Sequence, residues 1–379
     1  MIIYSISEND VRHSFANLKR RSSYENSLWF ITTHYGSLLL ILAALLITAS
    51  YAHSNTIEDS DAVKWFEKGR RACIEENWDF VIFAFDKAIL LNPNYTEVYF
   101  YRGLVYSSLG NNDKAIADCN KAIDLDPKFA KAYLGRGVVY DKLGNYNQAI
   151  ADYNKAIELD PKFAKAYLGC GVVYDKLGNY NQAIADYNKA IELNPKFAEA
   201  YVNRGNDYSD LGNYNQAIAD YNKAIDLDPK FAKAYLGRGF VYDKLGNYNQ
   251  AIIDYNKAID LNPKKSETYN SRGFSYSSLG KYSRAIVDYD KSIELNPKNE
   301  PAYINRGNAY NSLGNWNQAI ANYSKIIELN PKCADAYNNR AFIYLKHSDK
   351  IPGCRDAQKA CELGNCNVLN AAKAKGFCH

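Results

Sequence analysis

Four cysteines near the C-terminal end of this 379-residue chain have the type and spacing to do chemistry. They are Cys354, Cys361, Cys366 and Cys378, and they make up half of the eight cysteines present. Four thiolates could bind a zinc ion, or they could form two disulfides. Their intervals lack the paired C-x2-C knuckles of common zinc folds, so the spacing favours disulfides.

The other reactive residue types form no catalytic pattern. Only five histidines are present, and only His347 and His379 lie beyond the first 53 residues. Adjacent pairs such as Asp141 and Lys142 do not face each other on a helix. No glycine-rich phosphate loop and no C-x-x-C-H haem signature occurs. The sequence therefore gives no support to an enzyme, and we expect neither a cofactor nor a metal site.

A strict internal repeat supplies the elements that must position these residues. Eight prolines recur every 34 residues, at positions 93, 127, 161, 195, 229, 263, 297 and 331. Within residues 130–163, apolar and small residues fall at helical spacing in two runs. Gly144 lies where the first helix must stop, Asn145 and Gln148 could cap the second, and Pro161 ends it. Each unit is predicted to be a helical hairpin, stacked because one hairpin cannot bury both its faces.

The pattern resembles the tetratricopeptide repeat, which has a 34-residue period. The matching residues of one unit are Tyr133, Gly137, Tyr140, Ala149, Tyr153, Ala156 and Pro161. The resemblance implies an all-α, right-handed superhelical solenoid of about nine repeats. These begin at residues 62, 96, 130, 164, 198, 232, 266, 300 and 334, giving an array over 62–367 and a capping helix with a cysteine-rich tail over 368–379.

This chain departs from the family at one repeated position, where arginine replaces the usual leucine. The arginines are Arg102, Arg136, Arg204, Arg238, Arg272, Arg306 and Arg340. We expect their stems to lie along apolar surface, with each guanidinium near a helix end or a neighbouring carboxylate. A ligand-binding role for so regular an arginine is the alternative.

In this family the first helix of each hairpin lines a concave groove that usually binds a peptide. The resemblance thus implies a protein-interaction scaffold. Asparagines at the place of Asn203, Asn305 and Asn339 grip a peptide backbone in some members, since an amide both donates and accepts. Here glycine interrupts that row in three repeats. The candidate groove residues are Leu134, Val138, Asp141, Lys142, Leu168, Val172, Asp175, Lys176, Asn203, Asn206, Leu236, Phe240, Asp243, Lys244, Asn305, Asn308, Asn338 and Asn339.

The predicted helices select one pairing of the C-terminal cysteines. Residues 353–363 should form the last second-type helix, and 367–377 a closing helix folded back on it. That arrangement places position 354 opposite 378, and position 361 near 366. Pairing Cys366 with Cys378 would span a helix of about 15 Å, beyond disulfide reach. We predict the bonds Cys354–Cys378 and Cys361–Cys366, which would protect a terminal repeat from fraying.

Residues 1–52 have the layout of an export segment, with basic residues before an uncharged apolar run at 38–47. Cleavage after Ala52 would make it a signal peptide. Alternatively, Leu28 to Ala49 could be an uncleaved single-pass transmembrane anchor. Both interpretations place the repeats outside the cytoplasm, in the periplasm or the extracellular space, as in exported or membrane-anchored bacterial proteins of this repeat family.

The charge pattern bears on the partner. The formal net charge is +4 with both signs interspersed, which argues against nucleic acid because phosphate binding needs a basic stripe. We expect a protein or peptide partner. Two alternatives stay open. One is a structural spacer that self-associates through the near-identical repeats 130–163 and 164–197. The other is a redox or metal-binding protein built on the C-terminal cysteines.

Overall fold

A computed structural model describes residues 61–378, and the export segment predicted for residues 1–52 lies outside this range. The described residues form nineteen helices, labelled α3 to α21, and no strand. The all-α prediction is thereby confirmed. None of these helices is both long enough and apolar enough to cross a membrane.

The helices alternate between two sets along the chain. The first helices of the nine hairpins are, in chain order, α3 (Asp61–Ile74), α5 (Thr96–Ser108), α7 (Ala130–Lys142), α9 (Ala164–Lys176), α11 (Ala198–Asp210), α13 (Ala232–Lys244), α15 (Ser266–Ser278), α17 (Glu300–Ser312) and α19 (Ala334–Lys346). The second helices are α4 (Trp78–Leu91), α6 (Asn112–Leu125), α8 (Tyr146–Leu159), α10 (Tyr180–Leu193), α12 (Tyr214–Leu227), α14 (Tyr248–Leu261), α16 (Tyr282–Leu295), α18 (Trp316–Leu329) and α20 (Lys350–Glu362). The short α21 (Asn367–Ala374) closes the chain.

Local sequence sets the length of each helix. Gly144 has a φ of +77°, a left-handed conformation that glycine adopts without strain, and it ends the turn after α7. At the other end, Asp160 is extended and precedes Pro161, so α8 stops there. Asn145 occupies the N-cap of α8, but its side chain makes no capping hydrogen bond. The predicted capping box is therefore wrong, while the predicted helix start is right.

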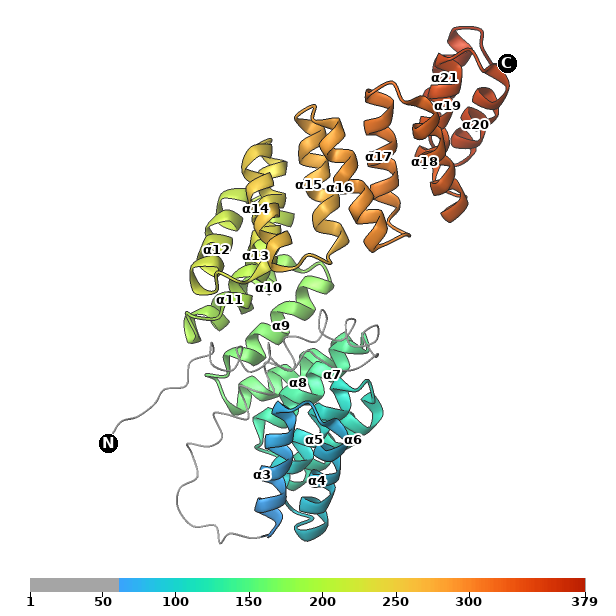
Figure 1. Cartoon of the computed structure of the whole chain (residues 1–379). Helices are drawn as coiled ribbons and strands as arrows, with labels where there is room; N and C mark the ends of the chain where they lie inside the picture. The colour runs from blue at the N-terminus through green and yellow to red at the C-terminus, as the bar shows by residue number, and fades with distance from the viewer. Residues whose placement is uncertain (1–60, 379) are drawn as a thin grey trace. The chain divides into compact units, whose positions relative to one another are not determined.

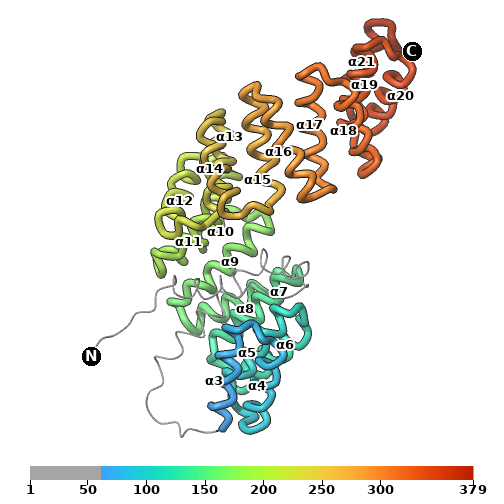
Figure 2. Tube along the Cα trace, viewed as in Figure 1, coloured from blue at the N-terminus to red at the C-terminus, as the bar shows by residue number. Residues whose placement is uncertain are grey.

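The chain divides into two compact units, with the boundary between Val173 and Tyr174 inside α9. In the first unit, α3 to α8 form three antiparallel hairpins that stack in chain order. In the second, α10 to α20 continue the same alternation, and α21 packs on α19 and α20 (Figures 1 and 2). Within each unit a hairpin contacts mainly the hairpins next to it in sequence, as expected of a helical repeat array.

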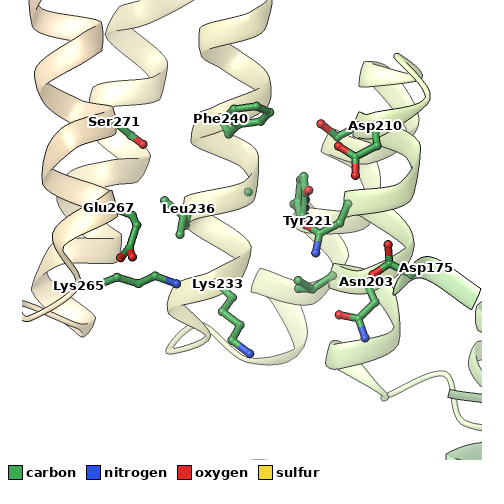
Figure 3. A pocket seen from close by; sticks show the side chains of 14 residues that line it. Asp175, Asn203, Asp210, Tyr221, Lys233, Leu236, Phe240, Lys265, Glu267 and Ser271 are labelled. Atoms are coloured by element: carbon green, nitrogen blue, oxygen red, sulfur yellow. Dashed lines mark hydrogen bonds between the residues drawn. The ribbon is translucent and has the colours of Figure 1, made fainter. Parts of the chain in front are cut away.

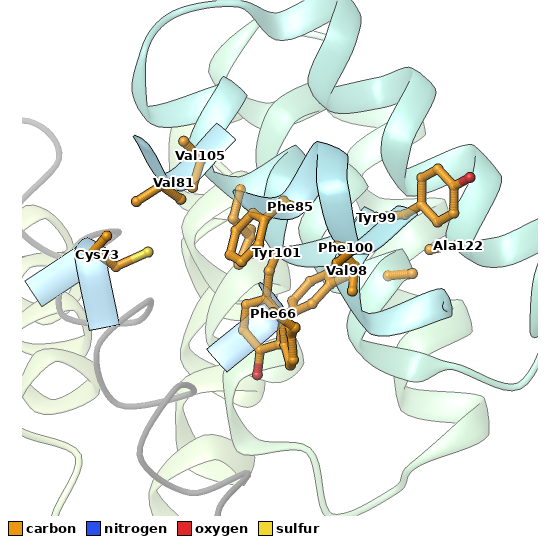
Figure 4. Close-up of a cluster of buried hydrophobic side chains, with 14 residues drawn as sticks. Phe66, Cys73, Val81, Phe85, Val98, Tyr99, Phe100, Tyr101, Val105 and Ala122 are labelled. Atoms are coloured by element: carbon orange, nitrogen blue, oxygen red, sulfur yellow. The ribbon is translucent and has the colours of Figure 1, made fainter. Parts of the chain in front are cut away.

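In most hairpins the core is built from one aromatic residue on the second helix and one glycine on the first. Tyr255 on α14 is completely buried, and a Cβ added to Gly239 on α13 would lie 2.8 Å from its ring. Glycine at this position lets the two helices approach closely enough to enclose the ring. The first hairpin uses Phe85 instead, and its ring lies 5.7 Å from that of Phe66 in an aromatic cluster (Figure 4).

Candidate functional site

In six of the nine hairpins a buried arginine–aspartate pair holds the two helices together and so positions the first helix. In one hairpin, Nε and Nη2 of Arg238 donate to the two carboxylate oxygens of Asp254 at 2.8 and 2.6 Å. Its Nη1 donates to Asn222, on the second helix of the preceding hairpin, at 2.5 Å. The equivalent pairs are Arg102–Asp118, Arg136–Asp152, Arg204–Asp220, Arg272–Asp288 and Arg340–Asp356.

These contacts show what the arginines that replace the family leucine do. Arg238 is 17% exposed and Asp254 is 1% exposed, so the pair is nearly sealed from solvent. The guanidinium bridges three helices, which fixes the stacking of one hairpin on the next. The role is structural, and the expected neighbouring carboxylate is present. The aspartates were missed in the sequence, although each lies 16 residues after its arginine.

The second unit contains a groove of about 580 Å³ along its first helices. Helices α11, α13 and α15 supply most of its lining, and α9 and α12 contribute Asp175 and Tyr221 (Figure 3). Leu236 and Phe240 lie along the middle of the groove on α13. The full lining is Asp175, Val202, Asn203, Asn206, Ser209, Asp210, Tyr221, Lys233, Leu236, Gly237, Phe240, Lys265, Glu267 and Ser271.

Five of the residues that the sequence singled out meet in this groove. They are Asp175, Asn203, Asn206, Leu236 and Phe240. Phe240 is 44% exposed, a large fraction for an aromatic ring on a folded surface. Asn203 makes no hydrogen bond with the described residues, so its amide remains available to a peptide backbone. Asn206 accepts a hydrogen bond of 2.7 Å from the hydroxyl of Tyr221 and is partly engaged.

Other candidate groove residues have structural contacts. Leu134 and Leu168 are buried, and Val138 and Val172 are half-buried, so the four offer little surface to a partner. Lys142 donates to the carbonyl of Ser107 at 2.7 Å. The remaining first-unit candidate, Asp141, is half-buried on α7.

In the second unit, three further candidates lie outside the groove lining. Asp243 accepts hydrogen bonds from Tyr255 and Ser275 at 2.7 and 2.6 Å. Lys244 lies 4.9 Å from the centre of the Phe240 ring, and Lys176 is half-buried beside Asp175.

The asparagines beyond residue 300 are also occupied within the protein. Asn305 donates to Asn270 at 3.1 Å, and Asn308 accepts from the Tyr323 hydroxyl at 2.6 Å. Asn338 accepts from the backbone N–H of Val368 at 3.2 Å, at the start of the closing helix. Asn339 donates weakly to Asn308 at 3.5 Å. Several of the asparagines that the sequence suggested for partner binding therefore form hydrogen bonds within the protein.

Several groove residues were not among the candidates. Lys233, Lys265, Glu267 and Ser271 line one end, on α13, the segment before α15, and α15 itself (Figure 3). Asp210 occupies the place in its repeat that Lys142, Lys176 and Lys244 occupy in theirs. That reversal of charge at a fixed repeat position was visible in the sequence. The sequence did not reveal that Lys233, Lys265, Glu267 and Ser271 lie close together, because their proximity depends on how neighbouring helices pack.

An acidic group lies at the other end of the groove. Asp175 and Asp210 line it, and both act electrostatically on Asp207, which is completely buried. Neither carboxylate oxygen of Asp207 has a hydrogen-bond partner of normal geometry. Burial, the charge of Asp175, a hydrogen-bonding interaction with its carboxylate, and the charge of Asp210 raise the pKa of Asp207 to about 8. Burial also raises the pKa of Asp175, while the interaction with Asp207 and the charge of Lys176 oppose this rise.

The C-terminal cysteines lie in the helices that close the second unit. Cys354 and Cys378 lie at disulfide-bonding distance with Cα atoms 5.6 Å apart, and Cys361 and Cys366 do so with Cα atoms 4.0 Å apart. The predicted closing helix starts as expected at residue 367 but ends at Ala374, and α20 begins at Lys350 rather than at residue 353. Leu369 and Ala372 of α21 pack on Ala341 and Ala357. Among the described residues, no group of three or more His, Cys, Asp or Glu is placed to hold a metal ion.

Comparison with known proteins agrees with the repeat architecture. Models of the tetratricopeptide repeat match residues 96–129, 130–163, 164–197, 232–265 and 266–299, and also 186–219 and 288–321. A related repeat model matches residues 205–246 and 307–348. These matches run without a gap from residue 96 to residue 348, about two thirds of the chain. The chain belongs to the tetratricopeptide-repeat family.

Solved structures share the fold at low sequence identity. A tetratricopeptide repeat protein from Parabacteroides merdae has a TM-score of 0.51 and 22% identity, over 65% of this chain and 98% of that one. The Cut9–Hcn1 hetero-tetramer of APC/C has a TM-score of 0.53 and 16% identity, over 82% of this chain and 75% of that one. At these identities the likeness shows the fold alone. No curated protein matches the sequence significantly.

Proposed function

We propose that this chain is a non-enzymatic scaffold that binds a segment of a partner protein in the groove lined by α11, α13 and α15. The observation that carries the proposal is the meeting of exposed Phe240, half-buried Leu236 and the available amide of Asn203 in one groove. Apolar side chains supply binding energy, and a free amide can pair with a peptide backbone. The buried arginine–aspartate pairs hold the helices in place, so the groove is formed before a partner binds.

The groove is long enough for a short peptide. Neighbouring packed helices lie about 8–10 Å apart, so crossing from α11 to α13 takes about three extended residues. Its volume of about 580 Å³ lies within the range of ordinary ligand sites. A helical or extended segment of a partner could therefore contact all three first helices.

The proposal is tested by selecting displayed random twelve-residue peptides on the full chain. We expect the selected peptides to lose affinity roughly thirtyfold with the double variant Asn203→Ala and Phe240→Ala, since each truncated hot-spot residue costs about 1 kcal/mol. Ile253→Ala is the matched control, because Ile253 is 58% exposed on the second helix α14. Failure to select any peptide, or equal losses in both variants, would contradict groove binding and favour a spacer role.

We further propose that the repeats face a compartment outside the cytoplasm. Two cysteine pairs at bonding distance close α19 to α21, and disulfides persist in oxidising compartments. Four other cysteines, Cys73, Cys119, Cys170 and Cys333, take part in no disulfide. Alkylation of protein taken from its native compartment and unfolded without reductant should label four thiols and leave four protected. Eight labelled thiols would contradict this location. N-terminal sequencing of the same sample distinguishes a cleaved signal peptide from a retained anchor.

A further inference from the structure

The acidic end of the groove differs from the equivalent site two hairpins later in the chain, and a comparison of the two sites shows how. In the hairpins that begin at residues 232 and 266, Asp243 is surrounded by donors, since Tyr255 and Ser275 both donate to its carboxylate. The equivalent residues 68 positions earlier are Asp175, Tyr187 and Asp207. The serine donor of one site is thus replaced by a carboxyl group in the other.

This replacement leaves buried polar groups unsatisfied. Neither oxygen of Asp207 has a hydrogen-bond partner of normal geometry, although its carboxyl group interacts with that of Asp175. The hydroxyl of Tyr187 has no partner, and both side chains are completely buried. The hydroxyl of Ser209, which lines the groove, is also buried without a partner. An unpaired buried polar group costs free energy that a bound partner can recover.

Electrostatics indicates the charge of that partner. Asp175 and Asp210 line the groove in front of Asp207, and repulsion from Asp210 raises the pKa of both Asp175 and Asp207. Lys176 is the cation that acts on Asp175, and it offsets only part of this repulsion. A cationic side chain of a partner would balance this charge.

We propose that the groove binds a partner segment whose arginine pairs with Asp175 and Asp210 and stabilises the ionised form of Asp207 behind them. A guanidinium has five donors in a planar fork, which suits two carboxylates better than a lysine ammonium does. The neighbouring surface of Leu236 and Phe240 lies one helix away on α13. It fits an apolar residue about three positions from the arginine. This inference rests on the proposed peptide-binding function and specifies its ligand.

Binding of the peptide arginine should also change the number of protons that the protein holds. The carboxyl of Asp207 holds its proton at pH 7 because its pKa is raised to about 8. An arginine placed at Asp175 and Asp210 stabilises the ionised form of Asp207, so the proton passes to the buffer. Binding should therefore release a fraction of a proton for each peptide bound.

The test uses the full chain and peptides selected from the random twelve-residue library. We expect the selected peptides to be enriched in arginine with an apolar residue about three positions away. Replacing that arginine by citrulline, which has the same shape but no charge, should weaken binding at least about tenfold. Asp175→Asn should weaken it similarly, whereas Asp260→Asn removes an equal charge from the exposed face of α14 and should have little effect.

Asp207→Ser separates this inference from the groove function. Serine is the residue that the equivalent site carries, so this variant should fold and should still bind peptides through Leu236 and Phe240. Calorimetry at pH 7 in phosphate and in Tris should detect proton release from the wild-type chain and none from the variant. Peptides that need Phe240 but tolerate citrulline, or that release no proton, would overturn the arginine site and leave groove binding standing. Failure to select any peptide would overturn both.

Discussion

The second helices of the array bury a row of aspartates against arginines, whereas Asp207 is buried among other carboxyl groups. The two situations differ in energy. A buried arginine–aspartate pair loses hydration but regains two charge-assisted hydrogen bonds, as in Arg238 with Asp254. Asp207 loses hydration and gains no hydrogen bond of normal geometry. It occupies the repeat position where Val139, Val173 and Val241 complete the core in other hairpins.

Asp207 should make stability depend on pH. Its pKa is about 8 in the folded protein and about 4 in the unfolded chain, so the folded state keeps a proton that the unfolded state has lost. The free energy of unfolding should therefore fall as pH rises from about 4 to about 8 and level off above that. Asp207→Val should remove most of this decline and raise the unfolding free energy at pH 8 by about 5 kcal/mol, the free energy that corresponds to four pKa units.

Urea unfolding of both proteins at several pH values tests this prediction. A smaller decline should remain in the variant, because burial also raises the pKa of Asp186, to about 6. Asp186 lies in the one full repeat where Cys170 replaces the arginine. Identical pH profiles for wild type and Asp207→Val would contradict the assignment of the decline to Asp207.

The arginine–aspartate pairs predict an asymmetric mutational response. Arg238→Ala should destabilise the protein by about 3 kcal/mol, because it leaves the carboxylate of Asp254 buried without its partner. The double variant Arg238→Leu and Asp254→Leu should be much closer to wild type, because two apolar side chains leave no charge unpaired. Denaturant titrations of both variants measure these changes. A double variant as unstable as the single one would show that the pair stabilises the fold beyond its charge balance.

At the scale of one helical hairpin, two glycines have different roles. Gly239 in the middle of α13 lies against the buried ring of Tyr255, whereas Gly246 forms the turn to α14 with a φ of +74° and open space around it. The first is required by close packing and the second by backbone conformation. Both recur every 34 residues, so one sequence pattern records two separate physical constraints.

Alanine substitution should distinguish these constraints. In Gly239→Ala the new Cβ would meet the Tyr255 ring at 2.8 Å, and an enclosed ring cannot move aside. We expect a loss of roughly 2–3 kcal/mol from overpacking. Gly246→Ala should cost about 1 kcal/mol, the penalty for a left-handed alanine. Midpoints of urea unfolding give both values. An equal or smaller loss in Gly239→Ala would mean that the two helices can separate without cost.

At the scale of the whole array, stability is a sum of hairpin and neighbour terms. In each compact unit a hairpin packs mainly on the hairpins adjacent to it in sequence. A terminal hairpin lacks one neighbour, so it should open at lower free energy than an internal one. Closure by α21 and by the Cys354–Cys378 bond acts on that weak point.

Removing this bond should therefore have a local effect. We expect the double variant Cys354→Ser and Cys378→Ser to lose about 3 kcal/mol of local stability, the value typical of closing a loop of this length. Hydrogen exchange should accelerate in α19 to α21 and stay unchanged in α11 to α16. Cys333→Ser, which alters a free cysteine in the same region, is the control. Acceleration throughout the second unit would show that its hairpins unfold as one cooperative block.

Much of the fold could be read from the sequence because every constraint on it is local and repeated. Gly144, Pro161 and the spacing of small and apolar residues fix the start, end and buried face of each helix without reference to distant residues. The pairing Cys354–Cys378 and Cys361–Cys366 followed from the same helix bounds, and its chemical state stays a prediction. The predicted capping hydrogen bond of Asn145 was wrong, because a helix can start at the same residue with several different side-chain arrangements.

The site was only partly predictable, because it depends on contacts between helices. Sequence alone determined that first helices 34 residues apart present equivalent positions, and it brought Asn203, Leu236 and Phe240 to attention. Only the tertiary structure showed that the other amides are used internally, that Arg238 clamps Asp254, and that Asp207 is buried behind Asp175. The physical reason is that periodicity specifies which face of a helix a residue occupies. Hydrogen bonding and burial depend also on which side chain the neighbouring helix places opposite it.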